Sequence, residues 1–366
     1  TYLVKTQCAK DLYNPNDLSL IPTYALNLDE PPEKRWSHIV INYKDQLENL
    51  FDYFRQNQNQ YKIFLDNNNQ NLDKLAESFP EPYRQEILGM SNATGIGVED
   101  FMLLNVFYEL SSSCSSIVAQ DFQGEIFLAR NLDFGLLLGW DTRNDTWMTT
   151  QLLRKLTINL FFYRENQLLF KSTTLVGFVG LLTGLKPNKY SLSINQRKDN
   201  VPGIAGIFSW VAGNSMNASW VTLLGREVFE QDLNYLEVVD RLSQTVLLAP
   251  VYYIIAGTNE FQGAVVTRNQ TDLLDLWILG SNNSWFLGQT NYDRWKAPLA
   301  IDDRRTPIYV CMNDYGRENL SFDSLFNVLS TQPVLNKLTI HTTLIKVRTG
   351  QYESYFQECK TPCPLF

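Results

Sequence analysis

The sequence of 366 residues predicts an α+β fold, in which antiparallel sheets are covered by helices. Three observations predict this class. The first third carries apolar residues at helical spacing, two later groups of segments alternate in the manner of strands, and a pair of helices separates those two groups. Separate runs of helices and strands are typical of layered α+β proteins, whereas parallel sheets show a regular alternation of strand and helix.

The first third is expected to be mainly helical. One helix carries the apolar stripe of a half-buried helix, at positions i, i+3, i+4 and i+7, in Leu47, Leu50, Phe51 and Phe54. A second helix is expected through the residues PYRQEILGM. A third is expected over residues 98–110, and it ends just before the serines that surround Cys114.

After Cys114 the period changes from that of a helix to that of a strand. The residues CSSIVA, then DFQG, then EIFLAR predict a first β-hairpin. Residues 156–162 alternate between the two sides of a strand, and the turn RENQ joins them to a partner strand, LLFKSTTL. The glycine-rich residues GFVGLLTG that follow predict a turn with close backbone packing.

Two helices are expected next, over about residues 218–230 and 234–247. A second group of strands follows in the residues VYYIIAG, GAVVTR, LLDLWIL and WFLGQT. One more helix is expected around residues 322–329, and one more strand in LTIHTTLIKV.

Composition excludes several classes of function. The net charge is −8 and no basic patch is present, so nucleic-acid binding is not expected. The longest apolar stretch, residues 175–185, is too short to cross a bilayer, which needs about 20 residues. Only His38 and His341 are present, without a zinc-binding motif, and no phosphate-binding glycine motif occurs. We therefore expect neither a metal nor another cofactor.

The five cysteines indicate disulfides and one thiol left over. Cys359 and Cys363 could close a small ring, and Cys8 could then form a long-range bridge with Cys311, which leaves Cys114. Five reduced cysteines in a cytosolic protein remain the alternative.

Possible glycosylation sites of the N-x-S/T type favour the secretory route, and they lie at Asn92, Asn144, Asn217, Asn269, Asn282 and Asn319.

Cys114 has two interpretations. As a buried thiol at the start of a strand it would be structural. As the first residue of a chain it could be a nucleophile without histidine, because its own α-amino group, with a pKa near 8, could act as the base. Such enzymes cut the bond before the nucleophile themselves. Here that bond is Ser113–Cys114, between a helix and a hairpin.

The residues CSSIVAQDFQGEIFLARNLDFG resemble the opening of the catalytic subunit in the acid ceramidases and in the N-acylethanolamine-hydrolysing acid amidases. Both groups are N-terminal-nucleophile hydrolases of the choloylglycine hydrolase type. Almost the whole chain takes part, through YALNLDEPPEKRW, FYEL, NDTW, QTNYDRWKAPLAIDDRRTP and VLSTQPVLNKLT. The spacer GWDTRNDTWMTTQ and the tail with Cys359 and Cys363 favour the acid ceramidase group.

The resemblance implies a four-layer αββα sandwich, self-cleavage at Ser113–Cys114 and two associated subunits. These are a mainly helical region, residues 1–113, and a catalytic region, residues 114–366. It implies hydrolysis of ceramide to sphingosine and a fatty acid, in the lysosome or outside the cell. Because ceramide is insoluble, we expect the site to receive it from a membrane surface or a saposin-like carrier protein.

The resemblance also implies the site residues. Cys114 is the nucleophile, and Arg130 and Asp133 match family positions beside its sulfur and its α-amine. Asn291 matches the side chain that helps to hold the tetrahedral oxyanion, and Arg304 matches an arginine that organises that pocket. A structural ion pair of Arg130 with Asp133 and a surface Arg304 are the alternatives.

One position departs from the family pattern. Gln196 stands where a glutamate is expected, between Asn195 and Arg197, and it lacks the carboxylate. If that acid orders an arginine or assists self-cleavage, the protein would be slower, differently selective or inactive. Three functions therefore stay open: ceramide hydrolysis, N-acylethanolamine hydrolysis, and lipid binding by a weakly active or inactive homologue.

Overall fold

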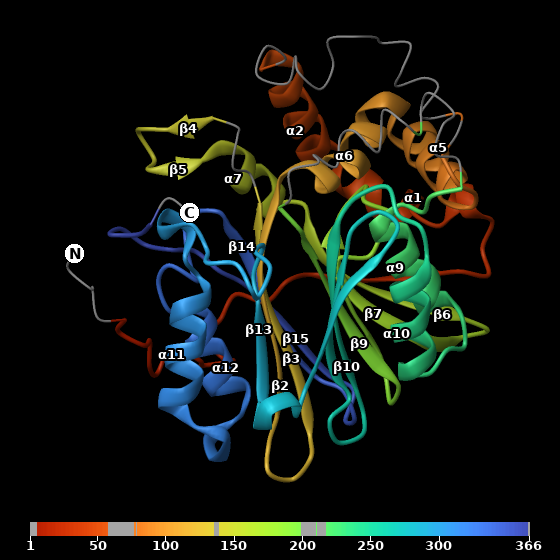
Figure 1. Cartoon of the computed structure of the whole chain (residues 1–366). Helices are drawn as coiled ribbons and strands as arrows, with labels where there is room; N and C mark the ends of the chain where they lie inside the picture. The colour runs from red at the N-terminus through yellow and green to blue at the C-terminus, as the bar shows by residue number, and fades with distance from the viewer. Residues whose placement is uncertain are drawn as a thin grey trace.

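The computed structural model describes residues 6–57, 79–134, 139–198 and 217–364, together with residues 77 and 210 (Figure 1). Two sheets lie face to face in it. The larger one has the strand order β1 (Thr23–Asn27), β6 (Thr157–Arg164), β7 (Gln167–Leu175), β8 (Thr183–Lys186), β9 (Tyr190–Gln196), β10 (Val251–Gly257), β11 (Gly263–Arg268) and β12 (Leu273–Ile278).

The smaller sheet carries Cys114. Its order is β13 (Phe286–Gln289), β2 (Ser112–Gln120), β3 (Ile126–Phe134), β14 (Thr339–Lys346) and β15 (Gln351–Phe356). All of its neighbouring strands are antiparallel. A short hairpin of β4 (Trp140–Asp141) and β5 (Thr146–Trp147) stands apart from both sheets.

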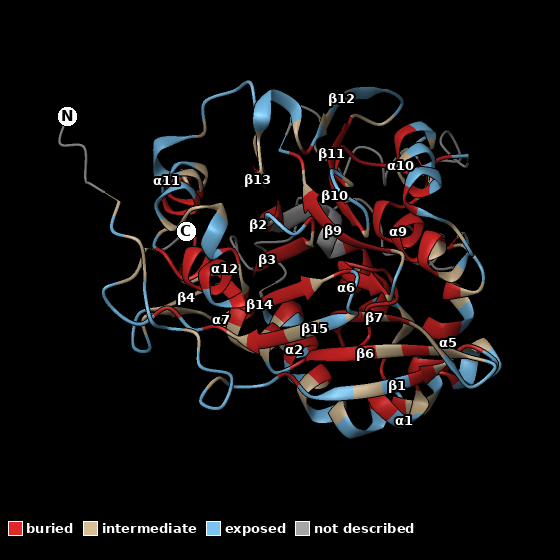
Figure 2. Cartoon of the chain, turned by 90° about the horizontal axis from the view of Figure 1, so that it is seen from below, coloured by how far each residue is buried: buried red, intermediate tan, exposed pale blue. Residues whose placement is uncertain are grey.

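Helices cover the outer face of each sheet and make four layers, α–β–β–α. The smaller sheet is covered by α11 (Arg305–Tyr315) and α12 (Phe322–Leu329), and the larger one by α9 (Val221–Glu230) and α10 (Tyr235–Gln244) (Figure 1). The inner strands of both sheets are buried over most of their length, whereas the edge strands β1, β12 and β15 are partly or largely exposed (Figure 2). The expected αββα sandwich is confirmed.

The remaining helices belong mostly to the first third of the chain and gather at one end of the sandwich (Figure 1). They are α1 (Ser37–Val40), α2 (Lys44–Gln56), α5 (Tyr83–Thr94) and α6 (Val98–Ser111), with α7 (Met148–Arg154) beside them. Five short 3-10 helices complete the described elements: η1 (Pro32–Lys34), η2 (Ile41–Tyr43), η3 (Ser281–Asn283), η4 (Ala300–Asp302) and η5 (Arg317–Asn319). Among the described residues, no helix has the length and apolar character that a membrane span requires.

Several elements were missing from the sequence-based prediction, and for those that build the sandwich there is a physical reason. β1 and β15 are partly exposed and show no clean alternation. β8 and β9 are buried strands whose sequences contain glycine, serine or asparagine among the apolar residues. α11 contains a proline in its first turn and polar residues along its length.

The expected glycine-rich turn is present, with Gly177 at a φ of 91°.

The expected disulfides are both present. Cys8 is bonded to Cys311 and Cys359 to Cys363, so Cys114 is the cysteine outside the two bonds. The first of them ties the N-terminal segment to α11, across 303 residues of sequence. It therefore connects the two regions that flank Cys114.

A buried ion network connects the same two regions. Glu86 of α5 accepts two hydrogen bonds from Arg226 of α9, at 2.6 Å each, and a further one from Arg35, at 2.9 Å. The side chains of Glu86 and Arg226 are fully buried. Burial alone would raise the pKa of the Glu86 carboxyl, but Arg226, Trp36 and Arg35 outweigh it and hold that pKa below its usual value.

This network yields a prediction about stability. Glu86→Gln should lower the free energy of unfolding by about 3–5 kcal/mol, because it removes the fully buried one of the two carboxylates, Glu86 and Glu230, that pair with the buried guanidinium of Arg226. Urea denaturation measures the change. Glu48→Gln is the matched control, since Glu48 pairs with Lys44 on the surface, where both side chains are nearly half exposed, and about 1 kcal/mol or less should be lost there. Equal effects of the two substitutions would contradict this account.

Candidate active site

Cys114 is fully buried near the start of β2, and its side chain faces the larger sheet. Side chains alternate along a strand, so Cys114 and Ser116 share one face while Ser113 and Ser115 share the other. Ser116 confirms the direction, because its hydroxyl lies 2.8 Å from that of Ser193 in β9. β2 begins at Ser112 in the continuous chain, so the Ser113–Cys114 bond lies within regular strand.

The sulfur of Cys114 contacts a buried guanidinium. Nη2 of Arg130 lies 2.7 Å from Sγ, and Nη1 donates to the carbonyl oxygen of Leu182 and to the hydroxyl of Thr183, at 2.7 Å each. Arg130 lies on β3, whose residues pair antiparallel with β2. Because a guanidinium is always charged in proteins, this contact favours a thiolate over a thiol.

The backbone nitrogen of Cys114 contacts Asn291, which follows β13. It donates to Oδ1 of Asn291 at 2.9 Å, and Nδ2 of Asn291 donates to the carbonyl oxygen of Gln196 at 2.7 Å. The amide oxygen therefore faces the nitrogen of Cys114. One Nδ2 hydrogen of Asn291 is donated to Gln196. The other could be donated in a hydrogen bond to an oxyanion.

Arg304 joins most of the other polar groups of the site. Nη1 donates to the carbonyl oxygen of Cys114 at 2.7 Å and lies 3.3 Å from Oδ2 of Asp133. Nη2 donates to Oδ1 of Asn291 at 2.8 Å, and Nε donates to Oδ1 of Asp302 at 2.8 Å. Arg304 precedes the first turn of α11 and is 1% exposed. Its side chain is a buried part of the site and not a surface charge.

Asp133 lies opposite Ser113 in the β2–β3 pairing, on the face of the sheet that Arg304 approaches. The hydroxyl of Thr339 donates to its Oδ1 at 2.7 Å. Burial raises the pKa of the Asp133 carboxyl to about 6, although Arg304 and Thr339 act in the opposite direction. The structure thus pairs Asp133 with Arg304, and not with Arg130 as a structural ion pair would require.

A cavity of about 160 Å³ opens beside Ser113, the residue that precedes Cys114. Its polar wall is formed by Lys198, Tyr292, Asp302 and Arg304, and Nζ of Lys198 lies 3.2 Å from Asp302. Its apolar wall consists of Leu299, Ile301 and Leu338, with Ser113 and Asn336 completing the lining. An amide with an apolar chain fits such a mixed lining.

Gln196 ends β9 and lies close to the site through its backbone carbonyl, which binds Asn291. The next residue, Arg197, forms a buried two-point ion pair with Asp293, at 2.7 and 2.9 Å. Tyr252 also donates to Asp293, at 2.7 Å. Arg197 is therefore ordered by Asp293, and a carboxylate at position 196 is not required for that purpose.

The other site predictions lie outside this cluster. Of the six possible glycosylation sites, Asn92, Asn144, Asn217, Asn282 and Asn319 are exposed and Asn269 is partly exposed.

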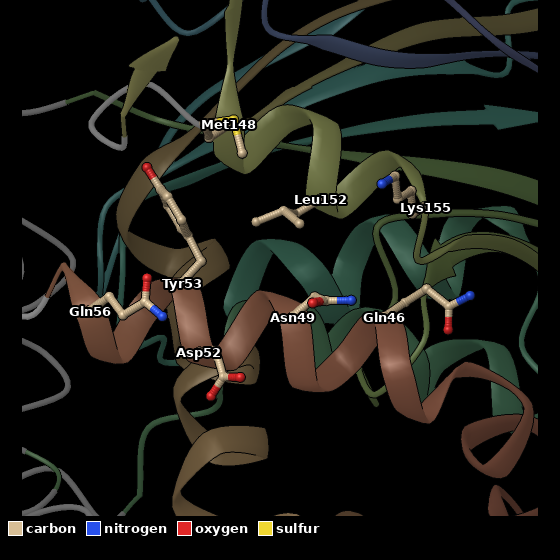
Figure 3. Close-up of a pocket in the computed structure, with 8 residues that line it drawn as sticks. All are labelled: Gln46, Asn49, Asp52, Tyr53, Gln56, Met148, Leu152 and Lys155. Carbon is tan, nitrogen blue, oxygen red and sulfur yellow. The ribbon is translucent and has the colours of Figure 1, made fainter.

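A second hollow, of about 370 Å³, lies between α2 and α7 and is lined mostly by polar side chains (Figure 3). Within the described ranges, no group of three or more His, Cys, Asp or Glu residues could hold a metal ion.

Four residues of the site were not singled out from the sequence. Asp302 stands in the block DDRRTP beside Arg304, which was the available signal. Thr183, Asn336 and Thr339 hold Arg130 or Asp133 through hydroxyl and amide groups. Such residues are common in turns and strands, so no local pattern marks them.

Comparisons with known proteins agree with this geometry. The family model of the linear amide C–N hydrolases, choloylglycine hydrolase family, matches residues 114–310. A model described as the beta subunit of N-acylethanolamine-hydrolyzing acid amidase matches residues 19–66. The first of these matches begins at Cys114.

Individual proteins are similar over most of the chain. Acid ceramidases from Homo sapiens and Mus musculus are each 40% identical to it, over 97% of this chain and 92% of theirs. The structure of a Caenorhabditis elegans N-acylethanolamine-hydrolyzing acid amidase ortholog matches with a TM-score of 0.56 and 32% identity, over 67% of this chain and all of that one. The chain therefore belongs to the choloylglycine hydrolase family of linear amide C–N hydrolases, and it is an amide-hydrolysing enzyme.

Proposed function

We propose that this enzyme is an acid amidohydrolase that cleaves the amide bond of ceramide, releasing sphingosine and a fatty acid. The observation that carries the proposal is the similarity to acid ceramidases, which extends over 97% of the chain at 40% identity. The buried Cys114, with Arg130 at its sulfur, supports the chemistry. The apolar wall of the adjacent cavity suits an acyl chain.

The nucleophile becomes active through self-cleavage. Sγ of Cys114 attacks the carbonyl carbon of Ser113, the nitrogen of Cys114 leaves as an amine, and water hydrolyses the resulting thioester. The products are a carboxylate on Ser113 and a free α-amino group on Cys114. The family match that begins at residue 114 supports this cut.

The two fragments, residues 1–113 and 114–366, remain associated as a heterodimer. Three connections support this part of the proposal. The disulfide of Cys8 with Cys311 joins them covalently, β1 of the first fragment pairs with β6 of the second, and the Glu86–Arg226 ion pair lies between them.

Hydrolysis then uses the thiolate and the new amine. The thiolate, next to Arg130, attacks the carbonyl carbon of the lipid amide, and the α-amino group of Cys114 passes a proton to the leaving nitrogen. Oδ1 of Asn291, now 2.9 Å from the nitrogen of Cys114, would hold that amine in place. The free Nδ2 hydrogen of Asn291 would receive the oxyanion, and Arg304 fixes the orientation of Asn291. Water finally hydrolyses the acyl-thioester, with the amine as base.

The proposed location is the lysosome or the extracellular space, where disulfides persist and Asn residues are glycosylated. The two disulfides and the exposed Asn-x-Ser/Thr sites support it. The lipid would reach the site from a membrane surface or a saposin-like carrier, because ceramide does not dissolve in water.

N-acylethanolamine hydrolysis is the second candidate. The match of residues 19–66 and the similarity to the Caenorhabditis elegans ortholog favour it. Lipid binding without hydrolysis is the third, and Gln196 motivates it. The ion pair of Arg197 with Asp293 speaks against this third candidate, because the neighbouring arginine keeps an acidic partner.

Self-cleavage gives a prediction for purified protein. After incubation at acidic pH, a denaturing gel with reductant should show two fragments, with the second beginning at Cys114. Without reductant they should migrate as one band, because the Cys8–Cys311 disulfide joins them. Cys114→Ala should abolish both the cut and lipid hydrolysis, whereas Cys363→Ala should still be cut. Turnover by Cys114→Ala would disprove the proposed nucleophile.

The substrate is tested by comparing products. The cleaved enzyme is given N-palmitoylsphingosine and N-palmitoylethanolamine in identical detergent micelles, and the released sphingosine and ethanolamine are measured. We expect kcat/KM to be at least about tenfold higher for the sphingosine amide, a preference of about 1.4 kcal/mol in transition-state binding. The opposite preference would favour the second candidate, and release of neither amine would favour the third.

Asp133 predicts a pH dependence of stability. Its folded pKa of about 6 lies above the usual value near 4. The stabilisation from its protonation is therefore full below about pH 4 and is lost as pH rises through about 6, at about 1.4 kcal/mol per pH unit. In uncut Cys114→Ala protein, adding Asp133→Asn should remove this decline in unfolding free energy.

Asp303→Asn provides the control for that measurement. It makes the same change in a partly exposed residue that caps the first turn of α11, and it should retain the decline. If the Asp133→Asn protein declines as steeply as its parent between pH 4 and 6, the raised pKa is refuted.

A further inference from the structure

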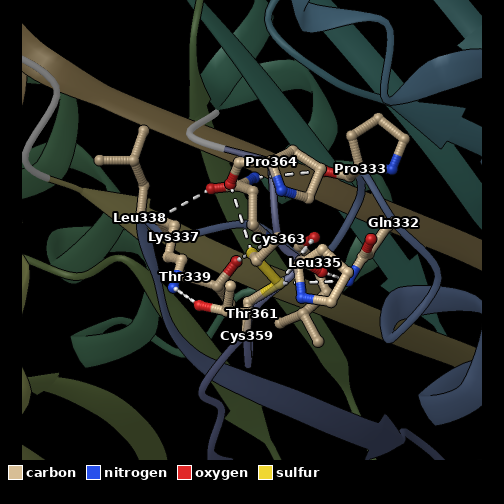
Figure 4. The surroundings of a disulfide bond; sticks show 12 residues. Gln332, Pro333, Leu335, Lys337, Leu338, Thr339, Cys359, Thr361, Cys363 and Pro364 are labelled. Carbon is tan, nitrogen blue, oxygen red and sulfur yellow. Dashed lines mark hydrogen bonds between the residues drawn. A yellow bond between two sulfur atoms is a disulfide. The ribbon is translucent and has the colours of Figure 1, made fainter. Parts of the chain in front are cut away.

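The last described residues of the chain form a small ring that packs against one loop of the active site. Cys359 and Cys363, four residues apart, close the ring after β15. The ring lies against residues 331–338, the segment that leads from α12 to β14 (Figure 4). Its position is therefore fixed by contacts with this segment.

The contacts are made by two backbone carbonyl groups, of the ring and of the residue after it, and by the hydroxyl of Thr361. Nε2 of Gln332 donates to the carbonyl oxygen of Pro362, and the backbone nitrogen of Lys337 donates to that of Pro364, at 3.0 Å each. Nζ of Lys337 donates to the hydroxyl of Thr361 at 3.2 Å. The segment is thus held near both of its ends (Figure 4).

The same segment carries residues of the active site on either side of Lys337. Asn336 and Leu338 line the cavity beside Ser113. The side chain of Asn336 lies near the carboxyl of Asp133 and lowers its pKa, and its Nδ2 donates to the carbonyl oxygen of Pro333 at 3.3 Å. The backbone of Asn336 is also held, because its nitrogen donates to the hydroxyl of Thr339. That hydroxyl in turn donates to the carboxyl of Asp133. The ring therefore contacts Gln332 and Lys337, and Asp133 contacts their close neighbours Asn336 and Thr339.

The size of the ring indicates a local effect. A disulfide stabilises a protein mainly by restricting the unfolded chain, and it does so less when the closed loop is short. The ends of a chain are poorly ordered unless they are tied down. Closing five residues therefore does little for the whole fold, but it holds the carbonyl groups of Pro362 and Pro364 where Gln332 and Lys337 can reach them.

We propose that the Cys359–Cys363 ring is a positioning element of the active site, which holds residues 331–338 so that Asn336 and Thr339 fix Asp133 and Leu338 shapes the cavity. The proposal rests on the proposed function, since it assigns the ring an effect on hydrolysis at Cys114. None of its residues needs to touch the substrate.

The test uses the full-length cleaved enzyme and the double variant Cys359→Ala/Cys363→Ala. We measure kcat and KM for an N-acyl lipid in micelles between pH 4 and 7, together with thermal unfolding. The double variant should lose about tenfold in kcat/KM and show a displaced pH profile, while its unfolding temperature falls by only a few degrees. Lys360→Ala is the matched control, because Lys360 is an exposed residue of the same ring and should retain the wild-type profile.

A second variant decides the matter if the double variant does not fold. Gln332→Ala keeps the disulfide and removes the hydrogen bonds of Nε2 to the carbonyl oxygen of Pro362 and to Sγ of Cys359, so it should displace the pH profile in the same direction by a smaller amount. A wild-type profile in the folded double variant, or in Gln332→Ala when the double variant is unfolded, would overturn the proposal. Absence of hydrolysis by the wild-type enzyme would instead refute the proposed function, so the two failures are distinguishable.

Discussion

The buried guanidinium of Arg304 is the group on which the rest of the site depends. It contacts the carbonyl oxygen of Cys114, the amide of Asn291 and two carboxylates, those of Asp133 and Asp302. Burying a cation costs several kcal/mol unless its partners are well placed. The strands β2 and β3, the segment after β13 and the start of α11 must therefore be positioned together before the site can form, and the four-layer fold provides that positioning.

The antiparallel pairing of β2 with β3 divides the site between the two faces of one sheet. Sγ of Cys114 and Arg130 face the larger sheet, where β8 supplies acceptors for the guanidinium. Asp133 lies on the other face, with Arg304. The sulfur of Cys114 is thus contacted from the face toward the larger sheet, and its backbone carbonyl is contacted by Arg304 from the other face. Cutting the bond before Cys114 would free a nitrogen that Asn291 already contacts.

Much of this arrangement could be predicted from the sequence, and the rest depends on long-range contacts. Helical spacing identified α2 and α12, and alternation identified β6, because apolar periodicity reflects a buried face. The partners of Asp133 could not be found this way. Thr339 lies 206 residues from Asp133 in the sequence, and a single threonine in a strand shows no motif that would mark it as a partner. The acidic partner of Arg197 could not be found this way either, since Asp293 lies 96 residues away.

The central claim is that Cys114 is both a new N-terminus and the acyl-carrying nucleophile. Mass spectrometry of enzyme quenched in acid during turnover, followed by trypsin digestion, tests both at once, because no Lys or Arg lies between Cys114 and Arg130. The account predicts a peptide of residues 114–130 with the fatty acyl group as a thioester on Cys114. An acyl group on another residue, or Cys114 found only in a peptide that extends upstream through Ser113, would contradict it.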